Sequence, residues 1–577
     1  MDAPAPSVAN PLRRWAGFLA SVVVALGLLA QLPAAPTPDG GAVTWTSIVP
    51  PVVAILIAVW FKRIIVALGS AVAVGAMLAY GPNPFVALPR GLVDLVWTNV
   101  GIEIQTSPFQ FTPGGNLFIF GFTFGLVGMV HVMTRSGGTN GLVQLVLRVA
   151  SGARSTRVAT ALMGCVVFFD DYANCVVVGT TMRPLTDRMR ISREKLAFLV
   201  DATAAPISGV AIISTWVAYE VGLFSDISRT LGLGLDGYAM FLAALPFRFY
   251  CVTMLLFVFA SSALGRDFGP MLAAERRSAA TGQVVRPGAA PLASDLLDRL
   301  GPPADKPHRW INAVAPIVAT VAAVVVGMLY SGAPAVADAG LPFDLASTDT
   351  WRIAFGEASS SKVLFGASLF GSAVAIALAA GQRILSVRDA VAAWLHGIPA
   401  MKLAVAILLL AWSIKSVCDV LATRHFLVAI LGSSVAPEWL PIATFLVAAA
   451  VAFATGTSWG TMGILLPVAL PLAWSLGGED PQNMLVFWLV CAAVLDGAIF
   501  GDHCSPVSDT TVLSSIASGC DHIDHVRTQI PYAFVCMGIA GLFGYLAIPL
   551  GVPSVAAYVG IAAATIGLLF IAGRRIE

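Results

Sequence analysis

Long apolar runs are the feature that most restricts what this chain can fold into. A helix needs about 20 consecutive apolar residues to cross the ~30 Å hydrocarbon core of a membrane. Such runs lie near residues 15–32, 43–61, 64–80, 115–134, 240–263, 310–330, 361–380, 401–421, 531–550 and 553–573. Four further apolar regions, near 158–182, 196–223, 437–475 and 485–518, are interrupted by polar residues, Gly or Pro. We therefore predict an all-α polytopic membrane protein, with the lipid bilayer as its surroundings.

The composition excludes several other classes of protein. Charged residues make up 11% of the chain, against about a quarter in soluble proteins. A net charge of +1 gives no reason to expect a nucleic acid partner. The eight cysteines contain no C-x-x-C pair, so we expect neither a disulfide framework nor a zinc site, and no cofactor. The first run, after Arg13 and Arg14, is also similar to a signal peptide, but a second span follows closely and we interpret the run as a retained helix.

The positions of basic residues conflict with a simple count of membrane crossings. Lysine and arginine gather in loops that stay in the cytoplasm. Counted from a cytoplasmic N-terminus, the segment RPLTDRMRISREK (183–195) would lie outside, although it carries five basic residues. Arg574 and Arg575 present the same conflict in the second half. We expect one region in each half to enter and leave by the same face, or to break midway.

A weak internal repeat explains why the same conflict occurs in both halves of the chain. Residues 158–169 align with 442–453, and P-I-S-x5-S at 206–214 aligns with P-V-S-x5-S at 506–514. The two copies start from opposite faces, which predicts two inverted-topology repeats with discontinuous helices. In transporters built this way, the binding site lies near the middle of the membrane, between the repeats.

The repeat suggests a division of the chain into six parts. We predict N-terminal membrane helices at 1–110, a first repeat at 111–263, a cytoplasmic linker at 264–309, connecting or scaffold helices at 310–398, a second repeat at 399–520 and C-terminal membrane helices at 521–577.

Three polar clusters lie where hydrocarbon is expected. They are FFDDYAN, DATAAPIS, and the pair ATGTSWGT with GDHCSPVSDTT. A carboxylate at membrane depth costs at least ~2.5 kcal/mol, so it is usually kept for function. Backbone broken by Gly or Pro is tolerated there only against protein or a wet cavity. The candidate cation- and proton-binding residues are Asp170, Asp171, Asn174, Asp201, Ser208, Thr457, Ser458, Asp502, Ser505, Ser508, Asp509 and Thr510.

These groups predict exchange of sodium ions for protons. Carboxylates, hydroxyls and freed backbone carbonyls are the hard oxygen ligands that a small alkali cation such as Na⁺ requires. Burial disfavours the charged form of a carboxylate, so a proton and a cation compete for it. Exchange then needs only a site that opens to one side at a time.

Several of these residues also have structural interpretations. Asp170 and Asp171 could end a helix at the cytoplasmic surface, and Asp201 and Glu220 could each anchor a helix at the membrane interface. The hydroxyls could satisfy free backbone groups. Lys415 and Asp419, four residues apart, predict a charge-balancing ion pair, although Lys415 could instead face an anionic substrate. His131 and His503 are typical of packed or interfacial histidines.

The segment from Gly501 to Thr511, G-D-x-x-S-P-x-S-D-T-T, resembles the hallmark of the NhaC-type sodium/proton antiporters of the ion-transporter superfamily. FDDYAN followed by GTTMRPLTDR is similar to a long-chain subgroup of that family. The resemblance implies inverted repeats with re-entrant hairpins, a transport domain that moves against a scaffold, a homodimer, and a place in the cytoplasmic membrane of a bacterium. Relatives also exchange malate, lactate or amino acids, so the alternative is a sodium- or proton-coupled carrier of a small organic anion or amino acid.

Two motifs imitate those of enzymes. Gly456-Thr-Ser-Trp-Gly460 matches the G-x-S-x-G nucleophile elbow, which belongs to a strand-to-helix turn in a soluble sheet. FDD and FGD are similar to intramembrane aspartyl protease motifs, but the second reads G-x-x-x-G-D in place of G-x-G-D. His522 and His525 suggest a metal site only weakly, because they lead into a span boundary. We therefore predict no enzyme.

Overall fold

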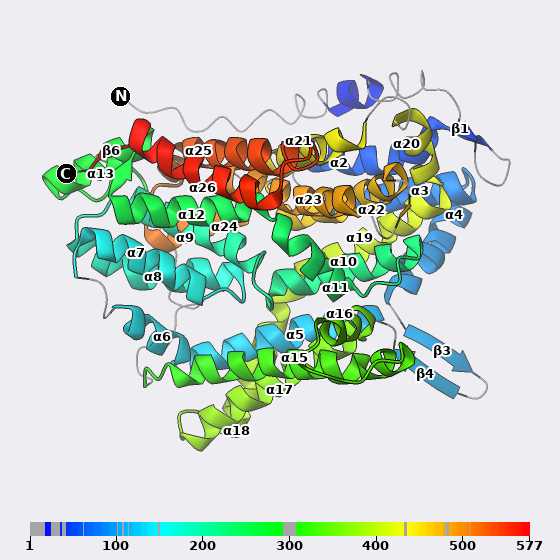
Figure 1. Ribbon diagram of the computed structural model, residues 1–577, viewed down its shortest axis with the longest axis horizontal. Helices are drawn as coiled ribbons and strands as arrows, with labels where there is room; N and C mark the ends of the chain where they lie inside the picture. The colour runs from blue at the N-terminus through cyan, green and yellow to red at the C-terminus, as the bar shows by residue number, and fades with distance from the viewer. Residues whose placement is uncertain are drawn as a thin grey trace.

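The computed structural model describes residues 18–24, 35–36, 42–61, 63–100, 102–106, 109–113, 115–147, 151–291, 307–431, 436–477, 479–480, 484–506 and 508–576. Over these residues the chain is almost entirely helical, and most helices run along the long axis of the molecule (Figure 1). Most of the predicted first run, 15–32, lies outside the described residues, and so does part of the predicted linker. The second run forms η1 (Trp45–Ile48) and α2 (Val49–Phe61).

Within the described residues, eight helices are long and apolar enough to cross a membrane. Two bent pairs, α3 (Ile64–Tyr80) with Pro84–Val100 and Gly237–Phe247 with α12 (Phe249–Leu264), raise the number to as many as 10. The prediction of a polytopic helical membrane protein is confirmed. The eight spans are formed by α5 (Gly115–Arg135), α15 (Ile311–Asp338), α17 (Ser360–Gly381), α21 (Leu440–Thr455) with the preceding η6 (Pro437–Trp439), α22 (Ser458–Leu476), α23 (Leu485–Cys504), α25 (His522–Ile539) with the following η7 (Ala540–Leu546), and α26 (Ser554–Ile571).

The first half contains a helical hairpin followed by an interrupted helix. The hairpin consists of α7 (Ala153–Val166) and α8 (Asp171–Arg188), which pack against each other. A 14-residue helix such as α7 spans only about 21 Å, so the chain turns back before crossing the hydrocarbon. The interrupted helix consists of α9 (Arg193–Ser208) and α10 (Thr215–Leu231), separated by non-helical residues 209–214.

The second half repeats this order of elements. After α19 (Lys402–Val420) and α20 (Thr423–Leu431), α21 and α22 meet at Gly456, whose φ of +70° favours glycine. Then α23 and α24 (Asp509–Ser518) form the second interrupted helix, separated by residues 505–508. The segments aligned in the sequence fall on matching elements, since 158–169 and 442–453 overlap α7 and α21, and 206–214 and 506–514 cover the two interruptions.

The basic segments gather at one end of the molecule, at the left of Figure 1. The backbone N–H of Arg193 donates to the carbonyl of Val284 at 2.9 Å, and Arg277 pairs with Glu194 at 2.9 Å. Strand β5 (Arg266–Asp267) pairs with β6 (Arg574–Arg575), which brings the C-terminus to the same end. The segment 183–195 therefore shares a face with α13 (Gly269–Thr281) and with the C-terminus. The α7–α8 hairpin, which starts and ends at this face, explains the crossing conflict in the first half.

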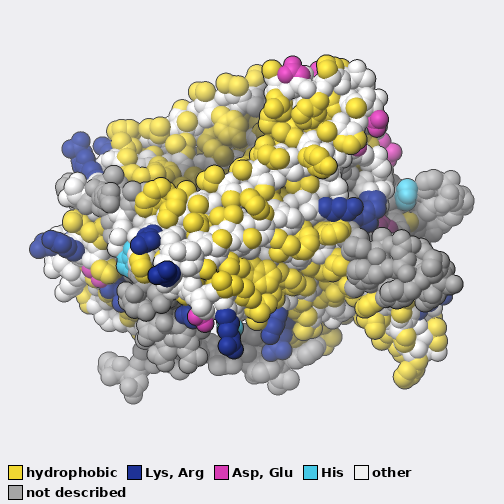
Figure 2. All heavy atoms as spheres, turned by 90° about the horizontal axis from the view of Figure 1, so that it is seen from below, with side chains coloured by type: hydrophobic (Ala, Val, Ile, Leu, Met, Phe, Trp, Pro, Cys, Tyr) yellow, Lys and Arg dark blue, Asp and Glu magenta, His cyan; other side chains and the backbone are white. Residues whose placement is uncertain are grey.

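A separate group of helices packs along α5. It contains α15, α17 and α18 (Val387–Gly397), in the lower part of Figure 1. Gly125 allows α5 and α17 to approach closely, because a Cβ there would meet Ser368 Oγ. The face seen from below is largely covered by hydrophobic side chains (Figure 2), and Val318, Val326 and Phe370 of this group are exposed. Exposed apolar side chains on long helices are expected where lipid surrounds them. At the right of Figure 1, the strands β3 (Ile102–Thr106) and β4 (Phe109–Pro113) form a hairpin.

Candidate ion-binding cavity

A cavity of about 810 Å³ lies where the tip of the α7–α8 hairpin, the start of α22 and the interrupted helices meet. Its lining comes from α5, α8, α10, α18, α19, α22, α23 and α24. His131, Thr134 and Arg135, near the end of α5, line one part of it, and Arg135 is exposed. The cavity therefore extends toward the end of the molecule that carries the basic segments.

Four helices begin at this cavity, and each has a polar N-cap. Asp170 caps α8, Ser214 caps α10, Thr457 caps α22 and Ser508 caps α24. Each side-chain oxygen accepts a backbone N–H of the first turn, which would otherwise lack a partner. Helix N-termini also carry a partial positive charge that stabilises nearby carboxylates. The hydroxyls of Thr457 and Ser508 are thus already used by the backbone, as one structural interpretation of the sequence expected.

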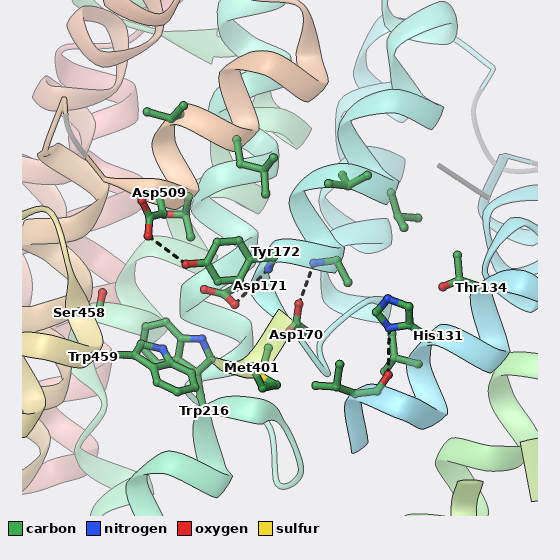
Figure 3. A pocket seen from close by; sticks show the side chains of 18 of the residues that line it. His131, Thr134, Asp170, Asp171, Tyr172, Trp216, Met401, Ser458, Trp459 and Asp509 are labelled. Atoms are coloured by element: carbon green, nitrogen blue, oxygen red, sulfur yellow. Dashed lines mark hydrogen bonds between the residues drawn. The ribbon is translucent and has the colours of Figure 1, made fainter. Parts of the chain in front are cut away.

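Carboxylates from both halves of the chain line the cavity (Figure 3). Asp170 and Asp171 come from the hairpin tip, and Asp502 and Asp509 flank the second interruption. Asp170 Oδ1 accepts the Ala173 N–H at 2.8 Å, and its Oδ2 accepts the Thr215 hydroxyl at 3.1 Å.

The second-half carboxylates contact neighbouring hydroxyls. Asp502 Oδ2 accepts the hydroxyl of Thr510 at 3.2 Å. Asp509 Oδ2 accepts the hydroxyl of Tyr172 at 3.2 Å, which joins the two halves directly. Ser458 also lines the cavity and donates its hydroxyl to the Ala498 carbonyl at 3.3 Å.

Asn174 and Ser208 lie behind the hairpin tip and do not line the cavity. The Asn174 amide donates to the carbonyls of Gly164, Val167 and Thr203 at 2.7, 3.1 and 3.2 Å, so it ties the end of α7 to α9. Ser208 donates to the Phe168 carbonyl at 3.0 Å. Both side chains therefore hold the tip in place.

Asp201 is fully buried in a separate polar cluster. Its Oδ2 accepts Gln529 Nε2 at 2.6 Å and the Thr511 hydroxyl at 3.2 Å, and it lies 3.4 Å from His525 Nε2. The interpretation of Asp201 as an interfacial anchor is therefore wrong, because its side chain has no exposed surface. The sequence analysis considered His525 only as a weak metal-site candidate and did not consider Gln529, although their i, i+4 spacing places both on one helix face.

A second buried cluster was also missed from the sequence. Arg248 Nε donates to Asp496 Oδ1 at 2.9 Å, and Arg248 Nη1 lies 3.3 Å from Glu220 Oε1. All three side chains are buried, so Glu220 is not an interfacial anchor either. Arg248 holds the bend before α12 against α10 and α23.

The remaining predicted residues also lie outside the cavity. Ser505 is buried at the end of α23, where its N–H donates to the Asp502 carbonyl at 3.1 Å. Lys415 pairs with Asp419 at 2.9 Å, as expected, and with Asp226 of α10 at 3.3 Å. His503 is packed, with Tyr250 and the Asp201 carbonyl as its partners at 3.1 and 3.0 Å, whereas His131 lines the cavity.

The chemistry of the lining suits a cation. Among the described residues that line the cavity, Arg135 is the sole lysine or arginine, whereas four are aspartates. Over the described part of the chain, no three His, Cys, Asp or Glu side chains converge as they would around a bound metal ion. The carboxylates are therefore spread along the wall and not gathered into a chelate. Ser458 begins helix α22 with no strand before it, so the G-x-S-x-G match is not a nucleophile elbow.

Broken helices that meet around an acidic cavity inside a membrane bundle define a secondary transporter and not an enzyme. The profile of the Na⁺/H⁺ antiporter family matches residues 209–548. The chain belongs to this family. An uncharacterized protein of Haemophilus influenzae is 30% identical over 92% of this chain and 95% of its own length. The Na⁺/H⁺ antiporter NhaC of Alkalihalophilus pseudofirmus is 36% identical over 16% of this chain and 19% of its own. Among solved structures, the YdaH transporter of Alcanivorax borkumensis is similar over 94% of this chain and 99% of its own, with 13% identity and a TM-score of 0.49.

Proposed function

We propose that this protein exchanges sodium ions for protons across the cytoplasmic membrane of a bacterium by alternating access. One observation carries the proposal. Carboxylates from the tip of the first hairpin and from the second interruption line the same cavity, where Tyr172 and Asp509 are in contact. Membership of the Na⁺/H⁺ antiporter family supports the choice of ions.

In this proposal Asp170, Asp171, Asp502 and Asp509 hold either a sodium ion or protons. Asp171 and Asp502 are buried, whereas Asp509 is exposed to the cavity, so the ion passes from Asp509 to the deeper pair. Like charges close together disfavour each other's ionisation, and a sodium ion relieves this repulsion as well as a proton does. Binding of one therefore releases the other.

Of the other predicted ligands, Ser458 and Thr510 contribute hydroxyls from the cavity wall. Asn174, Ser208 and Ser505 position the broken backbone, Thr457 and Ser508 cap helices, and Asp201 acts from behind the wall. Lys415 and Asp419 balance charge beside Asp226.

We propose that 111–263 and 399–520 are inverted repeats, which makes α7–α10 and α21–α24 the moving transport domain. The group of α5, α15, α17 and α18 then belongs to the scaffold, and two copies of the chain form a homodimer. The equal order of hairpin and interrupted helix in the two halves supports this division. FDDYAN at the hairpin tip supports placing the chain in the long-chain subgroup of the family.

The alternative of an organic anion is not favoured by the cavity. Lys415, which could face an anionic substrate, does not line it. The four aspartates would repel a carboxylate substrate.

Everted membrane vesicles test the proposal. With a pH gradient imposed and no organic solute present, added NaCl should dissipate the gradient, and Asp502→Asn or Asp171→Asn should abolish the response. Asp338→Asn, at the exposed end of α15, is the matched control and should respond like the unmodified protein. No response to sodium or other alkali cations in well-expressed protein would reject the proposal.

A further inference from the structure

The cavity is far larger than a sodium ion needs. At about 810 Å³, it lies within the range of about 300–1,000 Å³ that small-molecule sites occupy. A passage for water and ions alone needs no particular lining beyond polar groups. The lining here is instead divided between carboxylates and large aromatic and aliphatic side chains, which is the composition of a site for an organic molecule.

The charges of the lining select the sign of such a molecule. Asp171 and Asp502 are buried in the wall of the cavity, whereas the side chain of Asp509 is exposed. Of the basic and imidazole groups, Arg135 and His131 lie on the last turns of α5, and His396 lies on the last turn of α18. An anion would be repelled by the aspartates, whereas a cation would be held at them.

Aromatic rings lie beside these aspartates. Trp216 and Trp459 are in edge-to-face contact, with ring centroids 6.2 Å apart. Tyr172, 39% exposed, lies on the other side of Asp171, so that Asp171 is placed between the tryptophan pair and Tyr172 in Figure 3. An ammonium or guanidinium group over an aromatic face gains about 0.5–2 kcal/mol, and aromatic rings also bury an apolar body. A hydrated inorganic cation gains little from the aromatic face, and it has no apolar body to bury.

We propose that the cavity binds a small organic cation, with one ammonium or guanidinium group and an apolar or aromatic body. The charged end lies at Asp171 and Asp509, and the body packs on Trp459 and Tyr172, with the buried Trp216 behind Trp459. This inference rests on the proposed function, because it assigns to the sodium and proton site a further class of ligand that competes with sodium there.

Calorimetry on the purified full-length protein in detergent tests this with three probes that share one body. Phenethylguanidinium is the cation, phenethyl alcohol is the neutral analogue and 3-phenylpropionate is the anion. We expect the cation to bind at least tenfold more tightly than either analogue, and its affinity to fall at least threefold when KCl is replaced by NaCl at equal ionic strength. Equal binding of the neutral analogue would overturn the proposal, and so would binding of the cation that sodium does not weaken.

Variants locate the binding. Asp171→Asn and Trp459→Leu should each weaken binding of phenethylguanidinium at least fivefold, whereas Trp439→Leu, an exposed tryptophan outside the cavity, should change it less than twofold. Tyr172→Leu provides a second aromatic variant if Trp459→Leu does not fold, because Tyr172 is partly exposed. Equal effects of the cavity and control variants would reject the site. Calorimetry measures binding and does not depend on transport. Absence of sodium-driven proton flux would therefore reject the proposed function, whereas the binding data alone decide whether the cavity takes an organic cation.

Discussion

The hydroxyl of Tyr172 donates to Oδ2 of Asp509 at 3.2 Å, across 337 positions of the chain. Tyr172 belongs to the first turn of α8, at the tip of the first hairpin, and Asp509 opens α24 after the second interruption. The contact therefore joins the two elements that must change their access together if the transport domain moves as one body. It also lies in the cavity, where Asp509 is the most exposed of the four lining aspartates.

Loss of this contact should weaken sodium binding. A hydrogen bond to a charged group contributes about 1.5–3 kcal/mol, and the partial exposure of Tyr172 reduces this contribution. We expect Tyr172→Phe to raise the sodium concentration for half-maximal proton flux about three- to tenfold. Tyr330→Phe, at an exposed position of α15 outside the cavity, should leave this concentration unchanged. Equal values in the two variants would contradict a role for the contact.

Arg248 should be important for stability. Replacing it by Met leaves Glu220 and Asp496 buried without their cationic partner, and breaking a buried pair typically destabilises by about 3–5 kcal/mol. We expect a clearly lowered melting temperature in detergent for Arg248→Met. Arg229→Met removes an arginine that is 65% exposed and pairs with Asp226, so its melting temperature should stay close to that of the unmodified protein. A similar melting temperature for the two variants would show that the buried cluster of Arg248, Glu220 and Asp496 does not stabilise the fold.

The basic segment 183–195 should face the cytoplasm. In a background with the eight cysteines replaced by alanine, a cysteine at position 188 should be labelled from the same side as one at 574, and a cysteine at 341 from the opposite side. The contact of this segment with the 266–291 region is the reason. Labelling of positions 188 and 574 from different sides would contradict the re-entrant α7–α8 hairpin.

Acid should release the linker from α25. Burial acts to raise the pKa of Asp521, but N–H donors of Ala290, Asp524 and Ile523 outweigh it and lower the pKa below its usual value. A carboxyl whose pKa is lowered by folding stabilises the folded state at pH values above its unfolded pKa of about 3.9, and this contribution is lost as the pH falls through the lower, folded value.

Hydrogen exchange measures this release. The Ala290 amide should be protected at neutral pH and lose protection below about pH 4. In Asp521→Asn, which can still cap the helix but cannot ionise, the pH dependence should be reduced. Protection that is independent of pH in the unmodified protein would contradict this role of Asp521.

Much of the architecture could be predicted from the sequence, because hydropathy and the positions of arginines are strong local signals. The conflict between the basic segment 183–195 and the count of membrane crossings indicated the α7–α8 hairpin. The aligned segments fall on matching elements of the two halves. The pairing of Asp170 and Asp171 with Asp502 and Asp509 could be expected from the repeat alone.

Individual roles could not be predicted in the same way. Asn174 and Ser208 are residue types that also bind cations. Only the tertiary structure shows that their side chains donate hydrogen bonds to backbone carbonyls. The partners of Asp201 and of Arg248 come from distant helices, and no local pattern indicates such pairs. Thr457 and Ser508 are caps because the chain breaks directly before α22 and α24, a boundary that sequence periodicity places only to within a few residues.

The most direct test of the account is a flux measurement with purified protein in proteoliposomes, with an outward sodium gradient as the only driving force. The account predicts that the lumen acidifies as protons enter against sodium, that the ionophore monensin reproduces the effect without protein, and that Asp502→Asn and Asp171→Asn remove it. Asp338→Asn should acidify the lumen at the normal rate. Absence of acidification with the unmodified protein, or normal acidification with both cavity variants, would contradict sodium/proton exchange at this cavity.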